Sequence, residues 1–373
     1  MKIAVLKEGA ADESRVAATP ESVKKFTGLG ATVAVETGAG EGASLSDADF
    51  EGAEASVGSR AEVLKDADII LCVQGPDPAS LSGAKQDALL IGALNPYAER
   101  ARVEAYAAAG LQAMAMELLP RITRAQSMDI LSSQSNLAGY KAVLDAAAHY
   151  GRAFPMMMTA AGTIPAARVF VIGVGVAGLQ AIATARRLGA VVSATDVRLA
   201  TKEQIESLGA KPVFVEEGAI QGEGTGGYAT EMADDYKARQ AELVSSHIAK
   251  QDIVITTALI PGRPAPRLVT DAQIATMRPG SVIVDLAVEQ GGNAEGAVEG
   301  EVVERHGVKI VGYRNVPSRL AADASALFAR NLYNLLSAFW DKEKGLVLPD
   351  DDEIIVGIRL TRGGKVVSER LLG

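Results

Sequence analysis

The feature that most constrains this chain is a glycine-rich segment, Gly173-Val-Gly175-Val-Ala-Gly178. It follows the short apolar run Arg168–Ile172, which predicts a buried strand, and precedes Leu179–Gly189, which predicts a helix. In such a strand–turn–helix unit the first glycine makes the tight turn, the second lets the backbone approach a pyrophosphate, and the third lets the helix pack on the strand. The segment therefore predicts a dinucleotide site whose phosphates rest on the helix N-terminus.

An acidic residue stands where such a site needs one. Asp196 ends a second predicted strand, Ala190–Thr195, 18 residues beyond Gly178. A carboxylate there can hydrogen-bond an adenosine ribose and repels a 2′-phosphate, which favours NAD(H) over NADP(H), although Arg198 weakens the preference slightly. A chance glycine motif in a surface loop is the alternative. The predicted cofactor-binding residues from these segments are Gly173, Gly175, Val176, Ala177, Gly178, Asp196, Val197 and Arg198.

Composition bounds the class of protein. A chain of 373 residues predicts two domains, and a formal net charge of −9 argues against nucleic acid as a general partner. The single cysteine, Cys72, lies in an apolar run and cannot form a disulfide within the chain. No signal peptide is apparent at Met1–Glu8, and no apolar run approaches the ~18 residues of a spanning helix. These features predict a soluble or peripheral protein of a reducing compartment, with no metal site.

Short apolar runs alternate with helical segments along most of the chain, which predicts an α/β fold with two doubly wound, Rossmann-like domains. The predicted helices of the first part are Pro20–Leu29 and Ala98–Ala109. The predicted strands are Lys2–Leu6, Thr32–Glu36, Ala67–Val73, Ala88–Leu94, Leu111–Met116, Arg168–Ile172, Ala190–Thr195, Lys211–Val215, Asp252–Thr256, Ser281–Leu286 and Val308–Val311.

Two long helices are expected to join the domains. One covers Ser135–Ala148 and leads out of the first domain, and the other runs from Ser318 to about Trp340 and leads back. The first domain is therefore predicted to be discontinuous, with residues 1–134 plus 330–373. Residues 135–329 form the predicted NAD(H)-binding domain with the connecting helices.

Two further segments carry predictions of their own. Glu353–Val367 reads as a hairpin that turns at Gly363-Gly364. Glu216–Asp235 is rich in glycine and too long for a connector, so it is expected to be a lid. A surface insertion without a role is the alternative for the second segment.

A polar stretch, Met116–Asn136, follows a predicted strand and precedes the first long helix. It is expected at the carboxyl edge of a sheet, facing a crevice between the domains, where α/β proteins bind ligands. Helix capping explains some of its Ser and Asp residues but leaves Arg121, Gln126 and Gln134 unexplained. The polar side chains of the stretch are Arg121, Arg124, Gln126, Asp129, Ser132, Ser133 and Gln134.

Three segments carry a resemblance to a known family: Arg121–Tyr140, Arg152–Thr163 and Gly173–Ala185. They closely resemble the NAD(H)-binding component of proton-translocating nicotinamide nucleotide transhydrogenase, and the likeness runs nearly end to end. The wider superfamily includes alanine dehydrogenase, which shares the two-domain architecture and an early motif that appears here as Arg15-Val-Ala.

Two departures separate the chain from alanine dehydrogenase. That enzyme has a catalytic lysine where Gln74 stands and a histidine where Leu94-Asn-Pro stands. Oxidation of an amine or alcohol moves a proton with the hydride and needs a general acid or base, whereas hydride transfer between two nicotinamides moves no proton. The three histidines, His149, His247 and His306, are expected to be structural or solvated.

The resemblance implies roles for named residues. Arg121, Gln126, Asp129 and Ser132 would hold the nicotinamide carboxamide and the incoming second nucleotide. Tyr228, with Met232 close behind, would belong to a mobile lid. Further NAD contacts would come from the strand ends at Asp285–Gly292, where Glu289 is not expected to be a catalyst, and from Thr257, Ala258 and Leu259.

The resemblance also implies a function and partners. The chain would bind NAD(H), form a homodimer, and pass hydride to NADP(H) on a separate subunit, coupled to proton translocation by a membrane-spanning subunit. It would be active only with that NADP(H)-binding partner, and it would be cytoplasmic and peripheral on the inner face of the cytoplasmic membrane. An alanine dehydrogenase-like oxidoreductase and a non-catalytic NAD(H) sensor are the alternatives.

Overall fold

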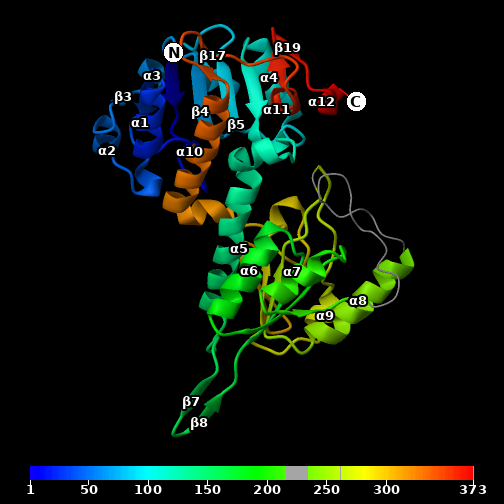
Figure 1. Ribbon diagram of the computed structural model, residues 1–373. Helices are drawn as coiled ribbons and strands as arrows, with labels where there is room; N and C mark the ends of the chain where they lie inside the picture. The colour runs from blue at the N-terminus through cyan, green and yellow to red at the C-terminus, as the bar shows by residue number, and fades with distance from the viewer. Residues whose placement is uncertain (216–233, 261, 373) are drawn as a thin grey trace. The chain divides into compact units, whose positions relative to one another are not determined.

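The computed structural model of the chain describes residues 1–215, 234–260 and 262–372 (Figure 1). These form two compact units. The first unit comprises Met1–Gln134 and Pro317–Gly373, and the second comprises Ser135–Val316. The predicted α/β class with two Rossmann-like domains is confirmed.

The first unit is built on a parallel six-stranded sheet in the order β3-β2-β1-β4-β5-β6. Alternate residues of β1 point to opposite faces, so that Ile3 and Val5 enter one core and Ala4 enters the other. The strands are β1 (Lys2–Val5), β2 (Thr32–Glu36), β3 (Ser56–Gly58), β4 (Ile69–Gln74), β5 (Leu89–Ala93) and β6 (Gln112–Ala115).

Helices cover both faces of this sheet. Phe26 of α1 and Phe328 of α10 share one core, whereas Leu64 of α3 and Tyr106 of α4 lie in the other. The helices of the first unit are α1 (Pro20–Gly28), α2 (Asp47–Glu51), α3 (Arg60–Leu64), α4 (Arg100–Ala108), α10 (Ala321–Ala338), α11 (Glu353–Ile358) and α12 (Glu369–Leu372).

The second unit repeats the same winding. Its sheet has the order β11-β10-β9-β12-β13-β15-β14, parallel except for the edge strand β14. The strands are β9 (Arg168–Ile172), β10 (Val191–Thr195), β11 (Lys211–Pro212), β12 (Ile253–Thr256), β13 (Val282–Asp285), β14 (Val302–Arg305) and β15 (Val308–Val311). The helices are α6 (Val176–Arg187), α7 (Thr201–Ser207), α8 (Asp234–Ile248) and α9 (Asp271–Ile274), and α5 (Ile130–His149) runs from one unit into the other.

A two-stranded hairpin, β7 (Met157–Thr159) with β8 (Gly162–Ile164), projects from the second unit (Figure 1). All six of its strand residues are exposed. The sequence pattern did not predict this hairpin, nor the short edge strands β3 and β14. Edge strands carry weak hydrophobic patterns because much of their surface faces solvent.

The tail differs from its prediction. Only Thr361–Arg362 and Lys365–Val366 pair as a hairpin, turning at Gly363-Gly364 as expected, whereas Glu353–Ile358 is the helix α11. The run of Ile and Val residues there has the composition of a strand. Asp352 caps the helix by accepting hydrogen bonds from the N–H groups of Ile354 and Ile355, and burial of the apolar face in the core decides in favour of the helix.

The second crossing between the units also differs. The second unit ends at Val316 rather than at residue 329, within a 3-10 turn, Val316–Leu320. Helix α10 therefore belongs wholly to the first unit and lies beside α1 (Figure 1). The cause is burial, because the apolar face of α10, including Phe328 and Leu332, fills the core of the first unit.

Candidate functional site

The β9–α6 turn of the second unit has the geometry that the glycine pattern predicts. Gly173 has φ 96°, a conformation that favours glycine. A Cβ on Gly178 would lie 1.9 Å from the carbonyl oxygen of Gly173, so the third glycine is required for α6 to pack on the turn. Gly175 differs because a Cβ there would meet no atom within 4 Å. The space beside the second glycine is open within the described part of the chain.

The N-terminus of α6 makes this open space suitable for an anion. Gly175 is the N-cap residue and offers no side chain to the free N–H groups of the first turn, which Val176, Ala177 and Gly178 begin. Those N–H groups and the helix dipole favour a negative group in front of them. On its inner side, the turn at Ala177 packs so closely on α5 that a Cβ at Gly139 would lie 2.0 Å from the Ala177 carbonyl oxygen.

Asp196 follows β10 and lies beside the same turn. Its carboxylate accepts the N–H of Val174 at 2.7 Å and the N–H of Arg198 at 2.8 Å, and the Arg198 guanidinium binds both carboxylate oxygens at 2.9 and 3.0 Å. Val197, between them, is half-buried. Asp196 thus holds the glycine turn, and its charge is paired with Arg198.

The turn after β12 packs against the glycine turn. Thr257 donates its N–H to the carbonyl oxygen of Ile172 at 2.9 Å and its hydroxyl to that of Gly173 at 3.0 Å. The N–H of Ala258 is donated to the Asn293 side chain at 3.0 Å. The backbone N–H groups of Thr257 and Ala258 are therefore engaged within the protein, and Leu259 is the member of the predicted trio with the exposed side chain.

Asn293 is a residue that sequence reasoning missed. It is fully buried and its amide binds both backbone polar groups of Ala258. Its neighbour Ala294 donates its N–H to Asp285, whose pKa is raised by burial. Glu289, in the same loop, accepts the N–H of Asn315 at 3.1 Å. The signal was an asparagine directly after two glycines beyond a strand end.

In the first unit, the polar stretch falls into two groups. Asp129 caps the start of α5, because its carboxylate accepts the N–H of Ser132 at 3.0 Å and also the Ser132 hydroxyl. Gln126 and Arg121 are exposed, with Gln126 in the 3-10 turn Thr123–Met128. Capping thus accounts for the contact between Asp129 and Ser132 but not for the two exposed side chains.

The remaining members of the stretch serve the fold. Gln134 is buried, accepts from Arg15 at 2.8 Å and donates to the carbonyl oxygen of Ala324 at 3.2 Å. The Ser133 hydroxyl donates to Asn331 on α10 at 2.7 Å, and Arg124 forms an ion pair with Asp352 at 2.7 Å. Gln134 therefore needs no role in binding to explain its place in the sequence.

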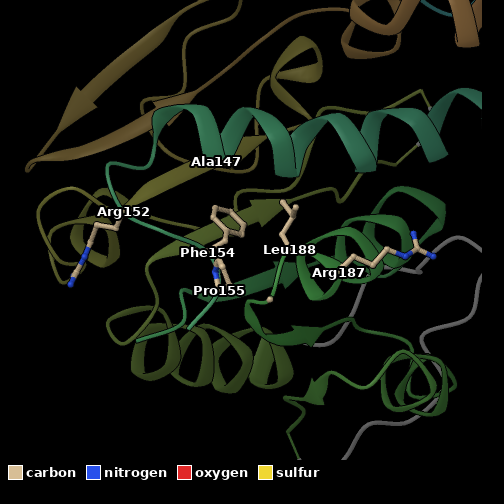
Figure 2. A pocket seen from close by; sticks show the side chains of 7 residues that line it. Ala147, Arg152, Phe154, Pro155, Arg187 and Leu188 are labelled. Carbon is tan, nitrogen blue, oxygen red and sulfur yellow. The ribbon is translucent and has the colours of Figure 1, made fainter. Parts of the chain in front are cut away.

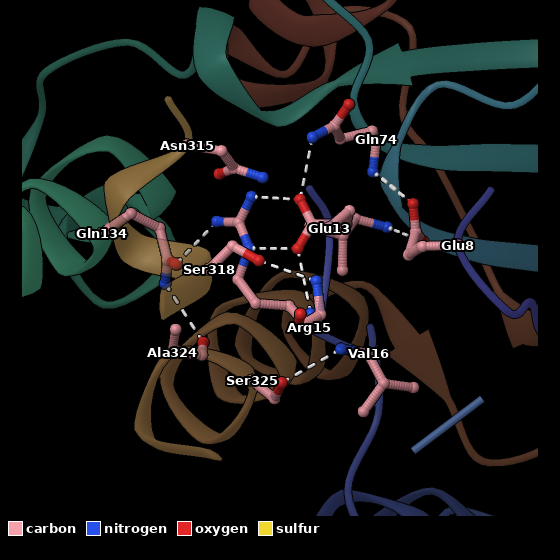
Figure 3. A network of polar contacts seen from close by, with 12 residues as sticks. Glu8, Glu13, Arg15, Val16, Gln74, Gln134, Asn315, Ser318, Ala324 and Ser325 are labelled. Carbon is pink, nitrogen blue, oxygen red and sulfur yellow. Dashed lines mark hydrogen bonds and ion pairs between the residues drawn. The ribbon is translucent and has the colours of Figure 1, made fainter. Parts of the chain in front are cut away.

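A buried polar network fills the edge of the first unit's sheet beside β1 (Figure 3). Arg15 binds both oxygens of Glu13 at 2.7 and 2.6 Å, and the Gln74 amide donates to Glu13 at 2.8 Å. Glu8 accepts the N–H groups of Val73 at 2.7 Å and Gln74 at 3.1 Å, and burial raises its pKa to about 7. The chain's own side chains occupy this edge.

The three histidines have structural partners. His149 contacts the Tyr313 hydroxyl at 2.9 Å, His247 contacts the Ser193 hydroxyl at 2.8 Å, and His306 pairs with Asp271 at 2.9 Å. Burial lowers the pKa of His247. These contacts agree with the structural role expected for them.

The predicted lid, Glu216–Asp235 with Tyr228 and Met232, falls almost entirely outside the described residues. In residues 1–215, 234–260 and 262–372, no group of three or more His, Cys, Asp and Glu residues could hold a metal ion. In the same part of the chain, no helix is long and apolar enough to cross a bilayer.

Comparison with known proteins gives a consistent result. Residues 4–138 match the alanine dehydrogenase/PNT N-terminal domain, and residues 142–369 match the alanine dehydrogenase/PNT C-terminal domain. The chain is 55% identical to the first part of the NAD(P) transhydrogenase alpha subunit of Rhodospirillum rubrum, over 100% of this chain and 99% of that protein. A solved transhydrogenase from Sinorhizobium meliloti is 55% identical, with a TM-score of 0.91 over 98% of this chain and 100% of that one.

Alanine dehydrogenase is a more distant relative. The enzyme of Mycobacterium tuberculosis is 32% identical over 80% of this chain and 75% of its own length. The resemblance identified from the sequence is thus confirmed: the chain belongs to the alanine dehydrogenase/PNT family, on its transhydrogenase side.

Proposed function

We propose that this chain is the NAD(H)-binding subunit of a proton-translocating NAD(P) transhydrogenase. The observation that carries the proposal is end-to-end identity of 55% to a transhydrogenase alpha subunit, together with a glycine turn that leaves the α6 N-terminus uncapped. The pyrophosphate of NADH rests on that N-terminus, and Asp196 faces the adenosine ribose. NADP(H) binds to a partner subunit.

The exposed members of the polar stretch act in hydride transfer. Gln126 and Arg121 orient the nicotinamide carboxamide and the incoming nucleotide, while Asp129 and Ser132 fix the start of α5 behind them. The proposed transfer is Re/Si-specific. Direct transfer between two nicotinamides moves no proton, so alignment of the two rings and exclusion of water are the contributions required of the protein. A nucleotide contact from Tyr228 is part of the same proposal.

The partner subunits supply what this chain lacks in the proposed reaction. The chain works at the inner face of the cytoplasmic membrane, bound to an NADP(H)-binding component and to a membrane-spanning component that couples hydride transfer to proton movement. The names of its relatives, which describe them as one portion of an alpha subunit, support a multi-subunit assembly.

The rival function is that of an alanine dehydrogenase. It requires a titrating side chain near the hydride path, and the position of that enzyme's lysine holds Gln74, whose amide is engaged with Glu13. A non-catalytic NAD(H) sensor is the second rival, which would bind the cofactor but never donate hydride.

The decisive experiment measures hydride transfer from NADH to an NADP⁺ analogue, with and without a purified NADP(H)-binding transhydrogenase component. Transfer only in the mixture supports the proposal. Turnover of pyruvate and ammonia by the chain alone identifies a dehydrogenase instead, and NADH binding without either reaction identifies a sensor.

The chain forms a homodimer through the second unit. The β7–β8 hairpin carries exposed apolar side chains, including Met156 and Met158, which are 62% and 80% exposed, and has no charged residue from Met156 to Ile164. An isolated two-stranded hairpin of this kind is marginally stable in water and gains from a partner. A second copy satisfies both hairpins by one twofold contact.

A groove of about 550 Å³ lies at the stem of the hairpin and supports this mode of dimerisation (Figure 2). Phe154, Pro155 and Leu188 give it an apolar floor, and Arg152 and Arg187 line it as well. Sedimentation of the wild-type chain is expected to show a dimer, and Met158→Asp a monomer at the same concentration. A Met158→Asp variant that stays dimeric places the interface elsewhere.

A further inference from the structure

The turn at residues 257–259 sets the space above the glycine turn. A Cβ at Gly173 would lie 2.6 Å from the Thr257 hydroxyl oxygen and 3.2 Å from the Ala258 nitrogen. Both separations are too short for a side chain at Gly173, so the turn at residues 257–259 lies against the bare glycine backbone. A movement of the turn away from that backbone would open the site and change the fit of a nucleotide on it.

One side chain fixes that turn. The side-chain oxygen of Asn293 accepts the N–H of Ala258 at 3.0 Å. The side-chain NH₂ group donates to the backbone carbonyl oxygens of Ala258 at 2.9 Å and Pro266 at 2.8 Å. Asn293 is 0% exposed. An amide is suited to this double contact because it carries a donor and an acceptor side by side.

Asn293 is itself held rigidly. Its backbone carbonyl oxygen accepts the N–H groups of Leu268 at 2.8 Å and Val269 at 3.0 Å. The next N–H, of Ala294, is donated to Asp285 at the end of β13 at 2.9 Å. A continuous set of hydrogen bonds therefore runs from the end of β13 through Asn293 to the turn at residues 257–259, which contacts the glycine turn.

We propose that Asn293 is a positioning residue for NAD(H), which sets nucleotide affinity by holding the turn at Ala258 without touching the nucleotide. This inference rests on the proposed function, because it assumes that NAD(H) binds on the glycine turn. Loss of the amide leaves the N–H and carbonyl groups of Ala258 without their buried partner, and the turn then moves toward water.

The test compares Asn293→Leu with Gln273→Leu in the full chain. Gln273 is a matched control because it is a buried amide of the same unit, bound to Ala241, Ser245 and Thr270 rather than to the turn at residues 257–259. Both variants are expected to melt at lower temperature. Only Asn293→Leu is expected to raise the Kd for NADH, by at least tenfold, in a titration followed by NADH fluorescence.

Two additional measurements keep the proposal falsifiable. Amide exchange without nucleotide should quicken at residues 257–259 in Asn293→Leu and not in Gln273→Leu. Asn293→Ala, which removes the amide without adding bulk or charge, should also raise the Kd and serves if the leucine variant does not fold.

Equal Kd changes in the Asn293 and Gln273 variants, or unchanged exchange at 257–259, would overturn the positioning role. If the wild-type chain itself fails to bind NADH, the proposed function fails and the affinity role falls with it. The exchange measurement then still decides whether Asn293 holds the turn.

Discussion

The two units share a winding order but treat the same topological position in opposite ways. In the first sheet, β1 lies between β2 and β4, and in the second sheet β9 lies between β10 and β12. The strand order of each sheet therefore reverses beside its first strand. In the second unit, three residues lead from β9 to an uncapped helix, α6. In the first unit, a long connection leads from β1 to α1, which Thr19 caps with a capping box.

The difference shows that one fold can either fill this position with its own side chain or leave it open. Backbone N–H groups at the end of β4 are satisfied by the Glu8 carboxyl group, an internal acceptor at the position where an α/β sheet otherwise binds a ligand. The second unit leaves the N–H groups at the start of α6 without a side-chain cap, so a phosphate can take that place. Ligand binding at the reversal point depends on the connection and not on the sheet.

The largest expected effect distinguishes Gly178, which is needed for packing, from Gly175, which is proposed to face the nucleotide. Gly178→Ala should destabilise the second unit by at least about 3 kcal/mol, because its Cβ would lie 1.9 Å from a carbonyl oxygen. Gly175→Ala is the matched control: the folded state has room for its Cβ, so stability should stay within about 0.5 kcal/mol. NADH binding should nevertheless weaken. Thermal melting and NADH titration of both variants check this, and equal stability loss would contradict the assignment.

The second prediction concerns the buried Glu8 carboxyl group of the first unit. Because burial raises the pKa of Glu8 to about 7 from 4.5, the folded unit holds its proton more tightly than the unfolded chain. Stability from this group is full below pH 4.5 and is lost as pH rises toward 7. Between pH 5 and pH 7 the wild type should therefore lose about 2 kcal/mol more than Glu8→Gln.

Denaturant unfolding followed by tryptophan fluorescence reports the first unit, because the chain's single tryptophan, Trp340, lies in that unit. Parallel pH profiles for wild type and Glu8→Gln would show that Glu8 does not retain a proton in the folded unit.

The fold was predictable where the hydrophobic pattern is strong. Thr32–Glu36, Arg168–Ile172 and Val308–Val311 have the predicted bounds, because central strands buried on both faces read as short apolar runs. The prediction was wrong for Glu353–Ile358, where capping and burial override β-branched composition. The second unit's end at Val316 depends on which core receives α10, and a local pattern carries no such information.

The candidate site was predictable in its backbone and less so in its side chains. The glycine-rich segment specifies local geometry through the positions of its glycines. Gly173 therefore makes the tight turn and Gly178 lets the helix pack on it, as expected. The sequence pattern does not explain Gln134, because its partners Arg15 and Ala324 are remote in sequence. Asn293 was missed for the same reason, since it lies 35 residues from Ala258.

The third prediction tests the adenosine end of the proposed site. Asp196→Ala should weaken NADH binding more than tenfold, about 1.4 kcal/mol, because it removes the ribose partner and releases the turn at Val174. A fluorescence titration measures the affinity. An unchanged Kd would rule out the assigned role of Asp196.

The smallest expected effect on binding lies in the first unit. Gln126→Asn shortens an exposed side chain and should slow hydride transfer by about tenfold while leaving the NADH Kd nearly unchanged, since the role proposed for Gln126 is to align the rings. Rapid-mixing measurement of transfer to an NADP⁺ analogue gives the rate. A large loss of NADH binding would make Gln126 an ordinary cofactor contact, and the division of labour between the units would fail.

The placement of α10 has a consequence for synthesis on the ribosome. Leu332 completes the core that contains Met114 of β6, yet it is made 218 residues later. At 5–20 residues per second, the half-finished first unit waits about 10–45 s with apolar surface uncovered, while all of residues 135–316 emerges and can fold. The second unit is thus the first to mature, and the nascent first unit is the part of the chain most in need of a chaperone.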